Sequence, residues 1–300
     1  MFFALLVSIL FAADTTKIVI VHTNDLENNF GFQKATWINP DFPPLLGGEE
    51  SFKVLLKEVR EEAEKSDAVF LLLNGGGMLG GNLIGQFTDF DATLRFMNEM
   101  GYDATTLGVK DFFHGADTLR EFVKSLKIPV VCANLTYAND TLKVVDWVKP
   151  YIIVEKKGLR IGIFGLITEY MPIFSEKKDI EGLFFLREIP TAKRVVKELK
   201  EKDVDLIIAL AHITYKHEKE LLSEVPEIDL VIGGLDRGGT RYPTEDRVNH
   251  NVDVRTYGRL SGAGIFKARF SKKYRTLVNY DWHIETLFVD RFPVNLLKGN

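Results

Sequence analysis

The stretch IVIVHTNDLENN, residues 18–29, decides the fold of this chain, because an apolar strand stops there at a polar segment. The residues from Ile18 to Val21 are β-branched and predict a buried strand. From Thr23 to Asn29 the chain gathers acids and amides at the end of that strand. In α/β proteins, functional groups collect beyond the carboxyl ends of the strands. The stretch therefore predicts the rim of a functional site.

Apolar strands alternate with amphipathic helices along most of the remaining chain. The predicted strands cover residues 17–24, 68–76, 103–108, 128–135, 146–168 (two strands joined by a Lys-Lys-Gly turn), 204–213 and 229–234. The predicted helices cover residues 51–66, 91–101, 116–126, 191–203 and 216–226. The segments 252–258, 262–271 and 276–287 alternate apolar and polar residues, as antiparallel strands do. This order predicts a mostly parallel or mixed sheet that is covered on both faces.

The composition suits one compact domain over about residues 16–290. The chain has 300 residues, of which 46% are hydrophobic, and this is enough for a large core. The formal net charge is −4 and there is no long basic run, which argues against nucleic-acid binding. Lys and Glu are plentiful and the only glutamines are Gln33 and Gln86, a bias of thermophile proteins.

The first 13 residues, MFFALLVSILFAA, fit the apolar region of a signal peptide and are too few for a typical membrane-spanning helix. We therefore expect export to the periplasm or the extracellular space, with no stable membrane span after the signal is removed. The alternative is a buried N-terminal strand or helix. The single cysteine, Cys132, lies in an apolar run and is interpreted as a core residue.

Six segments resemble, in order, motifs of the metal-binding domain of the 5′-nucleotidase family, within the calcineurin-like metallophosphoesterases. VHTNDLEN resembles HTNDxHG, LLLNGGGMLGG resembles LLDAGDxxxGS, and TTLGVKDFFHG resembles ALGNHEFDHG. VVCANL resembles the SANL segment, LIIALAHIT resembles IIALSHxG, and DLVIGGLDRG resembles DVIIGGHSH. The last strands, TYGRLSGAGIFKARF, resemble the closing segment of the family, so that the match spans about residues 17–285.

The resemblance implies a four-layer α/β/β/α metallophosphoesterase sandwich, with two mixed sheets flanked by helices. The chain stops where family members with a C-terminal nucleotide-binding domain continue, so we expect no such domain here. The family's chemistry uses two divalent metals that bind and orient a phosphate and generate a hydroxide nucleophile. This two-metal chemistry would make the chain a phosphoric monoester hydrolase if the family's metal ligands were present.

Most of the family's metal ligands are replaced in this sequence. Asp25 and His212 match family ligands, and Glu27 stands where the first motif has a His. The bridging Asp is replaced by Gly77. The other departures, in the third and sixth motifs, are Val109, Lys110, Phe113, Leu235 and Arg237.

We favour the interpretation that the protein is a catalytically degenerate 5′-nucleotidase-like protein that acts through binding or structure. A buried carboxylate cluster without metal needs countercharge. Lys110 and Arg237 would supply it, and each is expected within salt-bridge reach of Asp25 or Glu27. No cofactor is expected under this interpretation.

Two alternatives remain open at this stage. In one, Asp25, Glu27 and His212 bind a single Zn, Mn or Fe ion and the chain is a phosphoester hydrolase with a reduced site. In the other, Lys110, Arg237 and the glycine-rich turn hold a small anion or a phosphate-containing ligand. A protein partner is also compatible with the sequence. The residues expected to line the pocket are Asn24, Asn28, Asn74, Gly77, Asp111, Asn134 and Asp236.

Overall fold

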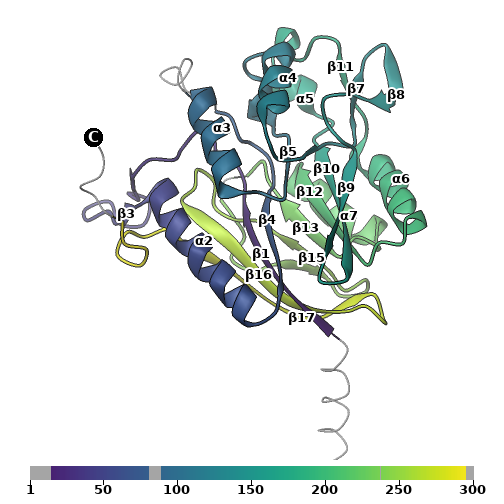
Figure 1. The fold of residues 1–300 in the computed structure, drawn as a ribbon. Coiled ribbons are helices and arrows are strands. Elements are labelled where there is room, and N and C mark those ends of the chain that lie inside the picture. The colour runs from purple at the N-terminus through teal and green to yellow at the C-terminus, as the bar shows by residue number, and fades with distance from the viewer. Residues whose placement is uncertain (1–14, 81–88, 237, 295–300) are drawn as a thin grey trace, which may run out of the picture.

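The computed structural model describes residues 15–80, 89–236 and 238–294, and it contains two six-stranded sheets packed face to face (Figure 1). The expected signal peptide, residues 1–13, and Arg237 lie outside the described residues. Within the described ranges, no helix has the length and apolar character needed to cross a membrane.

The first sheet has the strand order β17-β16-β1-β4-β5-β6. Its strands are β1 (Thr15–Thr23), β4 (Val69–Asn74), β5 (Ala104–Thr106), β6 (Val130–Val131), β16 (Gly262–Ser271) and β17 (Thr276–Thr286). The four neighbouring strands β1, β4, β5 and β6 run parallel to one another. Strand β16 is antiparallel to both of its neighbours, β1 and β17.

The second sheet has the order β14-β15-β13-β12-β10-β9. Its strands are β9 (Tyr151–Lys156), β10 (Leu159–Ile167), β12 (Leu206–His212), β13 (Leu230–Gly233), β14 (Thr244–Asp246) and β15 (Asn251–Val254). The four central strands are parallel, and β9 and β14 are antiparallel edges. The hairpin β9–β10 confirms the strand pair predicted around the Lys-Lys-Gly turn.

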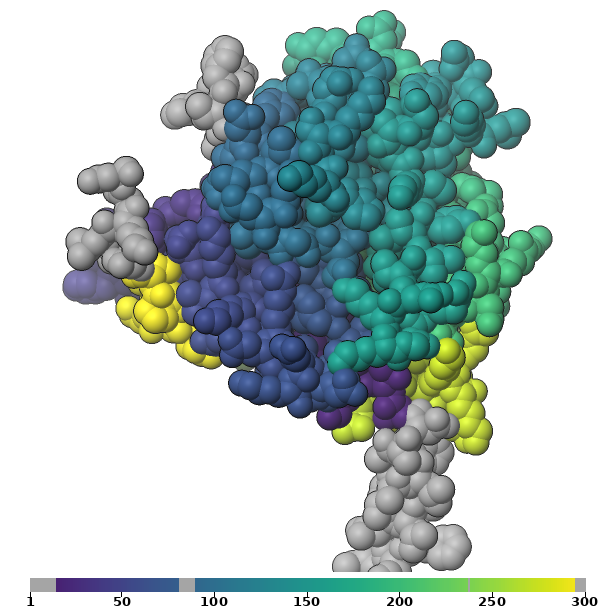
Figure 2. All heavy atoms as spheres, in the orientation of Figure 1, coloured from purple at the N-terminus to yellow at the C-terminus, as the bar shows by residue number. Residues whose placement is uncertain are grey.

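Helices cover the outer face of each sheet, which gives the predicted four layers (Figure 1). The first sheet is covered by α2 (Gly48–Lys65), α3 (Asp89–Met100) and α4 (Ala116–Ser125). The second sheet is covered by α6 (Glu188–Glu201) and α7 (Tyr215–Glu224). The purple-to-blue and the teal-to-green parts of the chain meet along a seam on the face seen in Figure 2.

The sequence of β1 explains its position between two layers. Successive side chains of a strand point to opposite faces. Ile18 and Ile20 accordingly pack in the core between the sheets, whereas Val19 and Val21 pack under the helices. The apolar run at residues 18–21 is therefore buried on both sides.

Two details differ from the sequence prediction. The segment predicted as an antiparallel strand at residues 252–258 forms β15, which pairs in parallel with β13. Two small sheets were not predicted, since strands of two to five residues show too little periodicity. They consist of β2 (Gln33–Lys34) and β3 (Leu45–Leu46), and of β7 (Leu135–Tyr137), β8 (Asp140–Val144) and β11 (Leu183–Phe185). Short helical turns complete the fold: η1 (Val109–Phe112), α5 (Met171–Phe174) and η2 (Lys177–Ile180).

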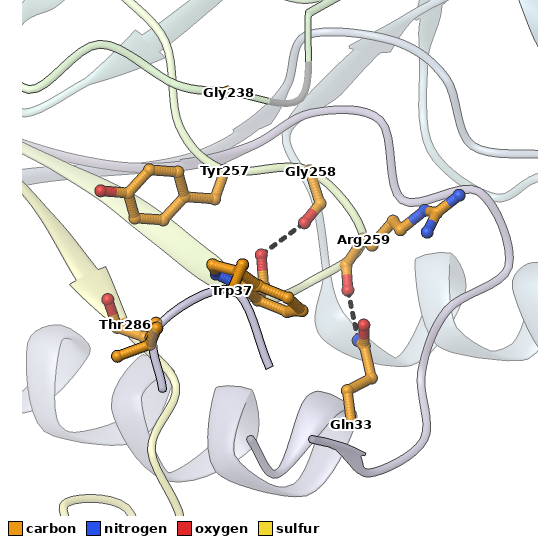
Figure 3. Close-up of a pocket in the computed structure, with 9 residues that line it drawn as sticks. Gln33, Trp37, Gly238, Tyr257, Gly258, Arg259 and Thr286 are labelled. Carbon is orange, nitrogen blue, oxygen red and sulfur yellow. Dashed lines mark hydrogen bonds between the residues drawn. The ribbon is translucent and has the colours of Figure 1, made fainter. Parts of the chain in front are cut away.

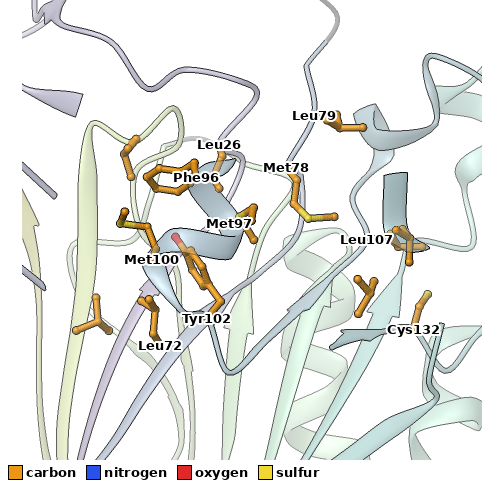
Figure 4. Close-up of a cluster of buried hydrophobic side chains, with 14 of the residues drawn as sticks. Leu26, Leu72, Met78, Leu79, Phe96, Met97, Met100, Tyr102, Leu107 and Cys132 are labelled. Atoms are coloured by element: carbon orange, nitrogen blue, oxygen red, sulfur yellow. The ribbon is translucent and has the colours of Figure 1, made fainter. Parts of the chain in front are cut away.

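Apolar side chains anchor the loops that follow the strands of the first sheet. Leu26, Met78 and Leu107 follow β1, β4 and β5, and all three are fully buried in one hydrophobic cluster (Figure 4). Cys132 is buried in the same cluster, as predicted for a core residue. Because each loop has a buried anchor, the polar residues beside it are held in fixed positions at the edge of the sheet.

Candidate functional site

Asp25 and His212 meet where the carboxyl end of β1 approaches that of β12. His212 Nε2 lies 3.1 Å from Asp25 Oδ1. The two residues are only 5% and 2% exposed. Asn24 Nδ2 donates a hydrogen bond to the other carboxylate oxygen, Asp25 Oδ2, at 2.9 Å. The tertiary structure thus brings together the two residues that match family ligands, although they lie in different sheets.

Glu27 forms an ion pair with a cation on each of its two carboxylate oxygens. Lys110 Nζ lies 2.8 Å from Glu27 Oε1. Arg259 Nε lies 3.3 Å from Glu27 Oε2. The carboxylate is 5% exposed, whereas the Lys110 and Arg259 side chains are 30% and 48% exposed. A buried carboxylate is costly without partners, and these two cations supply them.

The expected contact between Lys110 and Glu27 is therefore present in the structure. Arg237, the other expected cation, lies outside the described residues, so its contact with the acids stays a prediction. Arg259 was missed by sequence reasoning, because it lies 232 residues from Glu27 in a segment interpreted only as a closing strand. The feature of the sequence that could have identified Arg259 is its position directly after the Tyr257–Gly258 pair of the closing motif.

The loop of residues 25–28 is bound along its backbone to the loop that follows β4. The amides of Asp25, Glu27 and Asn28 donate to the carbonyl oxygens of residues 76, 77 and 78, at 2.8, 3.0 and 3.3 Å. The three donor residues have φ values of 48°, 50° and 59°. These values lie in the left-handed region, which residues other than glycine rarely adopt. Strained backbone of this kind persists only where the surroundings fix it.

Gly77, at the position of the family's bridging Asp, lies directly against Asp25. A Cβ added to Gly77 would lie 2.9 Å from Asp25 Cα and 3.0 Å from Asp25 Oδ1. Three further glycines enclose the His212 ring so closely that an added Cβ would lie 2.7 or 2.8 Å from its nearest ring atom. They are Gly76, Gly108 and Gly234. The backbone of these four glycines therefore packs closely against the Asp25–His212 pair.

These residues do not fit a two-metal centre. In residues 15–80, 89–236 and 238–294, no three His, Cys, Asp or Glu side chains are grouped so that they could hold a metal ion. Gly77, Val109 and Leu235 provide no ligand atom in their side chains. The family's bridging carboxylate would come from the position of Gly77, which has no side chain.

Three of the expected pocket residues use their side chains to hold the fold together. Asn74 Oδ1 accepts hydrogen bonds from Gly76 N and Thr105 Oγ1, at 2.8 and 2.9 Å. Asn134 bonds the backbone of Ile167 through both its Nδ2 and its Oδ1, at 2.6 and 2.9 Å. All three of these side chains are fully buried: Asn74, Asp111 and Asn134.

Asp111 caps two loops. Its carboxylate oxygens accept hydrogen bonds from Leu79 N and Gly108 N, both at 2.7 Å. Burial raises the pKa of Asp111 to about 6, although these two hydrogen bonds oppose the shift. The side chain therefore fixes the loop after β4 against the turn that carries Lys110.

The last two expected pocket residues have other contacts. Asn28 Oδ1 accepts a hydrogen bond from Thr93 Oγ1 of α3 at 2.5 Å. Asp236 is 66% exposed, and its carboxylate lies 3.3 Å from Arg255 Nη1. Arg255 in turn forms a buried ion pair with Glu218. Asp236 thus belongs to a separate charged group beside α7.

Comparison with known proteins gives sequence relatives that include several 5′-nucleotidases. None of the known protein-family models matches the chain. A 5′-nucleotidase of Vibrio cholerae is 30% identical over 236 residues, which are 74% of this chain and 40% of that protein. A probable 5′-nucleotidase of Treponema pallidum is 34% identical over 187 residues, which are 61% of this chain and 30% of that protein. The chain therefore spans less than half the length of these two relatives.

Solved structures share the fold over almost the whole chain. A 5′-nucleotidase precursor of Thermus thermophilus has a TM-score of 0.75 at 22% identity, covering 94% of this chain and 56% of that one. The calcineurin-like phosphoesterase YfkN of Bacillus subtilis has a TM-score of 0.73 at 20% identity, covering 91% of both chains. The predicted α/β/β/α sandwich is confirmed.

Proposed function

We propose that this chain, whose homologues are 5′-nucleotidases and calcineurin-like phosphoesterases, is a binding protein with a degenerate phosphoesterase centre. The observation that carries the proposal is the ion cluster on Glu27. Lys110 and Arg259 neutralise that carboxylate at the place where a catalytic centre would need metal cations. A cation that entered this site would be repelled by both side chains.

The ligand that we expect at this cluster is a small anion, such as phosphate or a phosphate-containing molecule. Two cationic groups, those of Lys110 and Arg259, contact the single carboxylate of Glu27. Lys110 and Arg259 are both partly exposed, so an anion can approach them. Lysine and arginine side chains are the usual partners of oxyanions in proteins.

The alternative function is that of a metal-dependent phosphoester hydrolase with a reduced, mononuclear site. Its support is the pair of Asp25 and His212, which the fold holds 3.1 Å apart. When bound, one Zn, Mn or Fe ion would supply an activated water for attack on phosphorus. Asp25 and His212 would be its ligands, and the chain offers Glu27 as a third only if Lys110 and Arg259 release it.

The two functions are distinguished by metal analysis and by a phosphatase screen of the purified chain with added Mn²⁺, Zn²⁺ or Co²⁺. For a binding protein, we expect substoichiometric metal, no turnover above that of the Asp25→Asn variant, and saturable heat of binding with inorganic phosphate. Lys110→Ala should weaken phosphate binding, and so should Arg237→Ala if that side chain joins the cluster. Lys65→Ala, which changes an exposed lysine on α2, is the matched control.

Stoichiometric metal together with turnover that Asp25→Asn abolishes would refute the degenerate centre. If neither turnover nor phosphate binding is found, the remaining interpretation is a structural role or a role with a protein partner.

Export belongs to the same proposal. The apolar segment at residues 1–13 supports it, as a signal-peptide region does in exported proteins. The test is sequencing of the mature N-terminus after cell fractionation. A protein that is found in the cytoplasm with Met1 retained would contradict export.

A further inference from the structure

The edge of the first sheet at β17 is long, and among the described residues no strand pairs with its outer side. β17 has 11 residues and lies beyond β16 at the end of the sheet. The other edges of the two large sheets are shorter, since β6 has two residues, β14 three and β9 six. A free edge presents unpaired N–H and C=O groups to any further strand. β17 is therefore the edge that offers the longest template for pairing.

β17 also lacks most of the features that protect sheet edges. Natural edge strands are usually short or carry lysine, proline or bulges. The sequence of β17, TLVNYDWHIET, contains no Lys, Arg or Pro. Its one irregularity is a register shift beside Val278, where the pairing with β16 skips a residue. At the other end, Thr286 lines a cavity of about 460 Å³ together with Trp37 of the β2–β3 loop (Figure 3). The regular part of the edge between these features is residues 279–285.

One face of this segment is apolar. Trp282 is 9% exposed, and Tyr280 and Ile284 pack with it against the core between the two sheets. The Trp282 ring stacks on His22 of β1 at a centroid distance of 5.0 Å, so it points away from the free edge. This position leaves room at the edge for a neighbouring strand.

The opposite face is polar, because side chains alternate along a strand. It carries Asn279, Asp281, His283 and Glu285. The Asp281, His283 and Glu285 side chains are 74%, 45% and 30% exposed. His283 lies between the two acids, at 3.6 Å from Asp281 and 3.9 Å from Glu285. These distances exceed those of good hydrogen bonds, so all three groups keep capacity for a further partner.

The polar face is complementary to a second copy of itself in the antiparallel direction. If a two-fold axis passes through Trp282, residues equally far before and after Trp282 lie opposite each other. Asp281 then lies opposite His283 of the second copy, and Asn279 lies opposite Glu285 of the second copy. In each pair a carboxylate, which accepts hydrogen bonds, meets an imidazole or amide group that donates them. The symmetry makes each pair occur twice.

The neighbouring registers do not have this complementarity. An axis through Asp281 would place that carboxylate opposite its own copy. An axis through His283 would place Asp281 opposite Glu285 of the second copy. Like charges directly opposite each other destabilise a strand pair. The order of the polar residues therefore favours the axis at Trp282 over the two adjacent ones.

We propose that two copies of this chain associate edge to edge through β17, antiparallel about a two-fold axis at Trp282, so that their first sheets form one continuous sheet. Tyr280 lies opposite Ile284 of the second copy on the apolar face, an aromatic and β-branched pair of the kind that stabilises sheets. No step of this argument uses Glu27, Asp25 or a metal ion. The association and the proposed function are therefore tested separately.

The test is sedimentation velocity of the full chain over a range of concentrations, about 1–300 µM. An interface of one strand from each copy is small, so we expect a monomer–dimer equilibrium with a dissociation constant on the order of 10–100 µM. Unfolding experiments at about 1 µM consequently report on the monomer. A chain that stays monomeric throughout the range would overturn the proposal.

Exchanging the paired groups tests the contact between them. Asp281→His removes the acceptor, and His283→Asp places two carboxylates opposite each other, so each change should weaken the dimer by about tenfold. The variant with both changes restores an acid opposite an imidazole and should recover the parent affinity. Asp140→His on β8, an exposed edge strand of a small sheet, is the matched control and should leave the affinity unchanged. Circular dichroism checks that each variant is folded.

Cysteine cross-linking tests the register. Under oxidising conditions, a mixture of the Asn279→Cys and Glu285→Cys proteins should form a disulfide-linked dimer, whereas neither protein should do so alone. The native Cys132 is buried and does not compete. Cross-linking of either protein alone would overturn the register. A dimer that is insensitive to both Asp281→His and His283→Asp would overturn the interface, and association through the apolar residues 1–13 would give that result.

Discussion

Lys110 Nζ and Glu27 Oε1 lie 2.8 Å apart and join the turn after β5 to the loop after β1. Glu27 is 5% exposed at this contact, so its charge is largely removed from water. Arg259 contacts the other oxygen from a third segment of the chain. The loop that follows the first strand is therefore held by ion pairs with two distant cations.

Removing Lys110 should destabilise the fold more than removing an ordinary surface lysine. We expect Lys110→Ala to lower the free energy of unfolding by about 1–3 kcal/mol, because Glu27 would keep a single cationic partner. Urea unfolding measures this difference. Lys65→Ala, which breaks an exposed pair with Glu61, should change stability by less than about 0.5 kcal/mol. In the variant that combines Lys110→Met with Glu27→Gln, part of the loss should be recovered; an additive loss would contradict the pairing.

Gly77 should not accept a side chain. Its φ is 73°, and an added Cβ would lie 3.0 Å from Asp25 Oδ1. Gly115 has a similar φ of 86° but nothing within 4 Å of an added Cβ, so it isolates the cost of the backbone. We expect Gly115→Ala to cost about 1 kcal/mol and Gly77→Ala to cost about 1–3 kcal/mol more. Equal melting temperatures of the two variants would show that the contact with Asp25 is not restrictive.

His22 should make the protein sensitive to acid. Its ring is fully buried and stacks on Trp282 at a centroid distance of 5.0 Å, and neither nitrogen has a hydrogen-bond partner among the described residues. Burial lowers the pKa of His22 from 6.5 to about 3. Between these pH values the unfolded chain binds a proton that the folded chain excludes. The stabilising contribution is thus complete above pH 6.5 and is lost as the pH falls toward 3.

The measurement is the unfolding free energy between pH 7 and pH 4, where His22 contributes a slope of up to about 1.4 kcal/mol per pH unit. His22→Phe should flatten the dependence of the unfolding free energy on pH. The comparison between the variant and the parent uses these slopes and not the absolute free energies. His283→Ala removes a side chain that is 45% exposed and should leave the slope as in the parent. A slope that is unchanged in His22→Phe would assign the acid sensitivity to other groups.

Asn134 should be a structural residue. It donates to the carbonyl oxygens of Ile167 and Leu186 and accepts from Ile167 N, at 2.6, 2.9 and 2.9 Å. Asn134→Ala would leave buried backbone groups unpaired and should cost about 2–4 kcal/mol. Thermal unfolding measures this cost, with Asn139→Ala at an exposed position as the control. If Asn134→Ala weakens anion binding without loss of stability, the residue belongs to the functional pocket instead.

Sequence patterns predicted the larger elements because their length makes the periodicity visible. The helix predicted at residues 51–66 is α2, Gly48–Lys65, and the strand predicted at residues 204–213 contains β12, Leu206–His212. The strands of the two small sheets escaped prediction, because they have only two to five residues. The parallel pairing of β15 with β13 also escaped prediction, because a strand's alternation does not specify the direction of its neighbour.

The candidate site was predicted in part. The motifs placed Asp25, Glu27, Lys110 and His212 at strand ends that converge, and the structure brings these residues into two contacting pairs. The motifs gave no sign that Asn74, Asp111 and Asn134 hydrogen-bond within the fold, because the direction of a side chain depends on loop geometry. The cavity at Trp37 also went unpredicted, since its walls come from segments that are more than 200 residues apart in sequence.

The sequence by itself determined that residues 18–21 form a buried strand and, through the resemblance to a known family, the layers of the fold and the positions at which the family's ligand residues are replaced. Ile18, Val19, Ile20 and Val21 are all apolar and β-branched, as in a strand that is buried on both faces. The side chains of Gly77, Val109 and Leu235 have no ligand atom in any fold. Only the tertiary structure decided which side chains pair with the two acids, Asp25 and Glu27. Glu27 pairs with Lys110 and Arg259, and Asp25 with His212, because packing across the two sheets fixes side chains that are distant in the sequence within a few ångströms. Electrostatic attraction at such short range depends on that placement and not on the residue types alone.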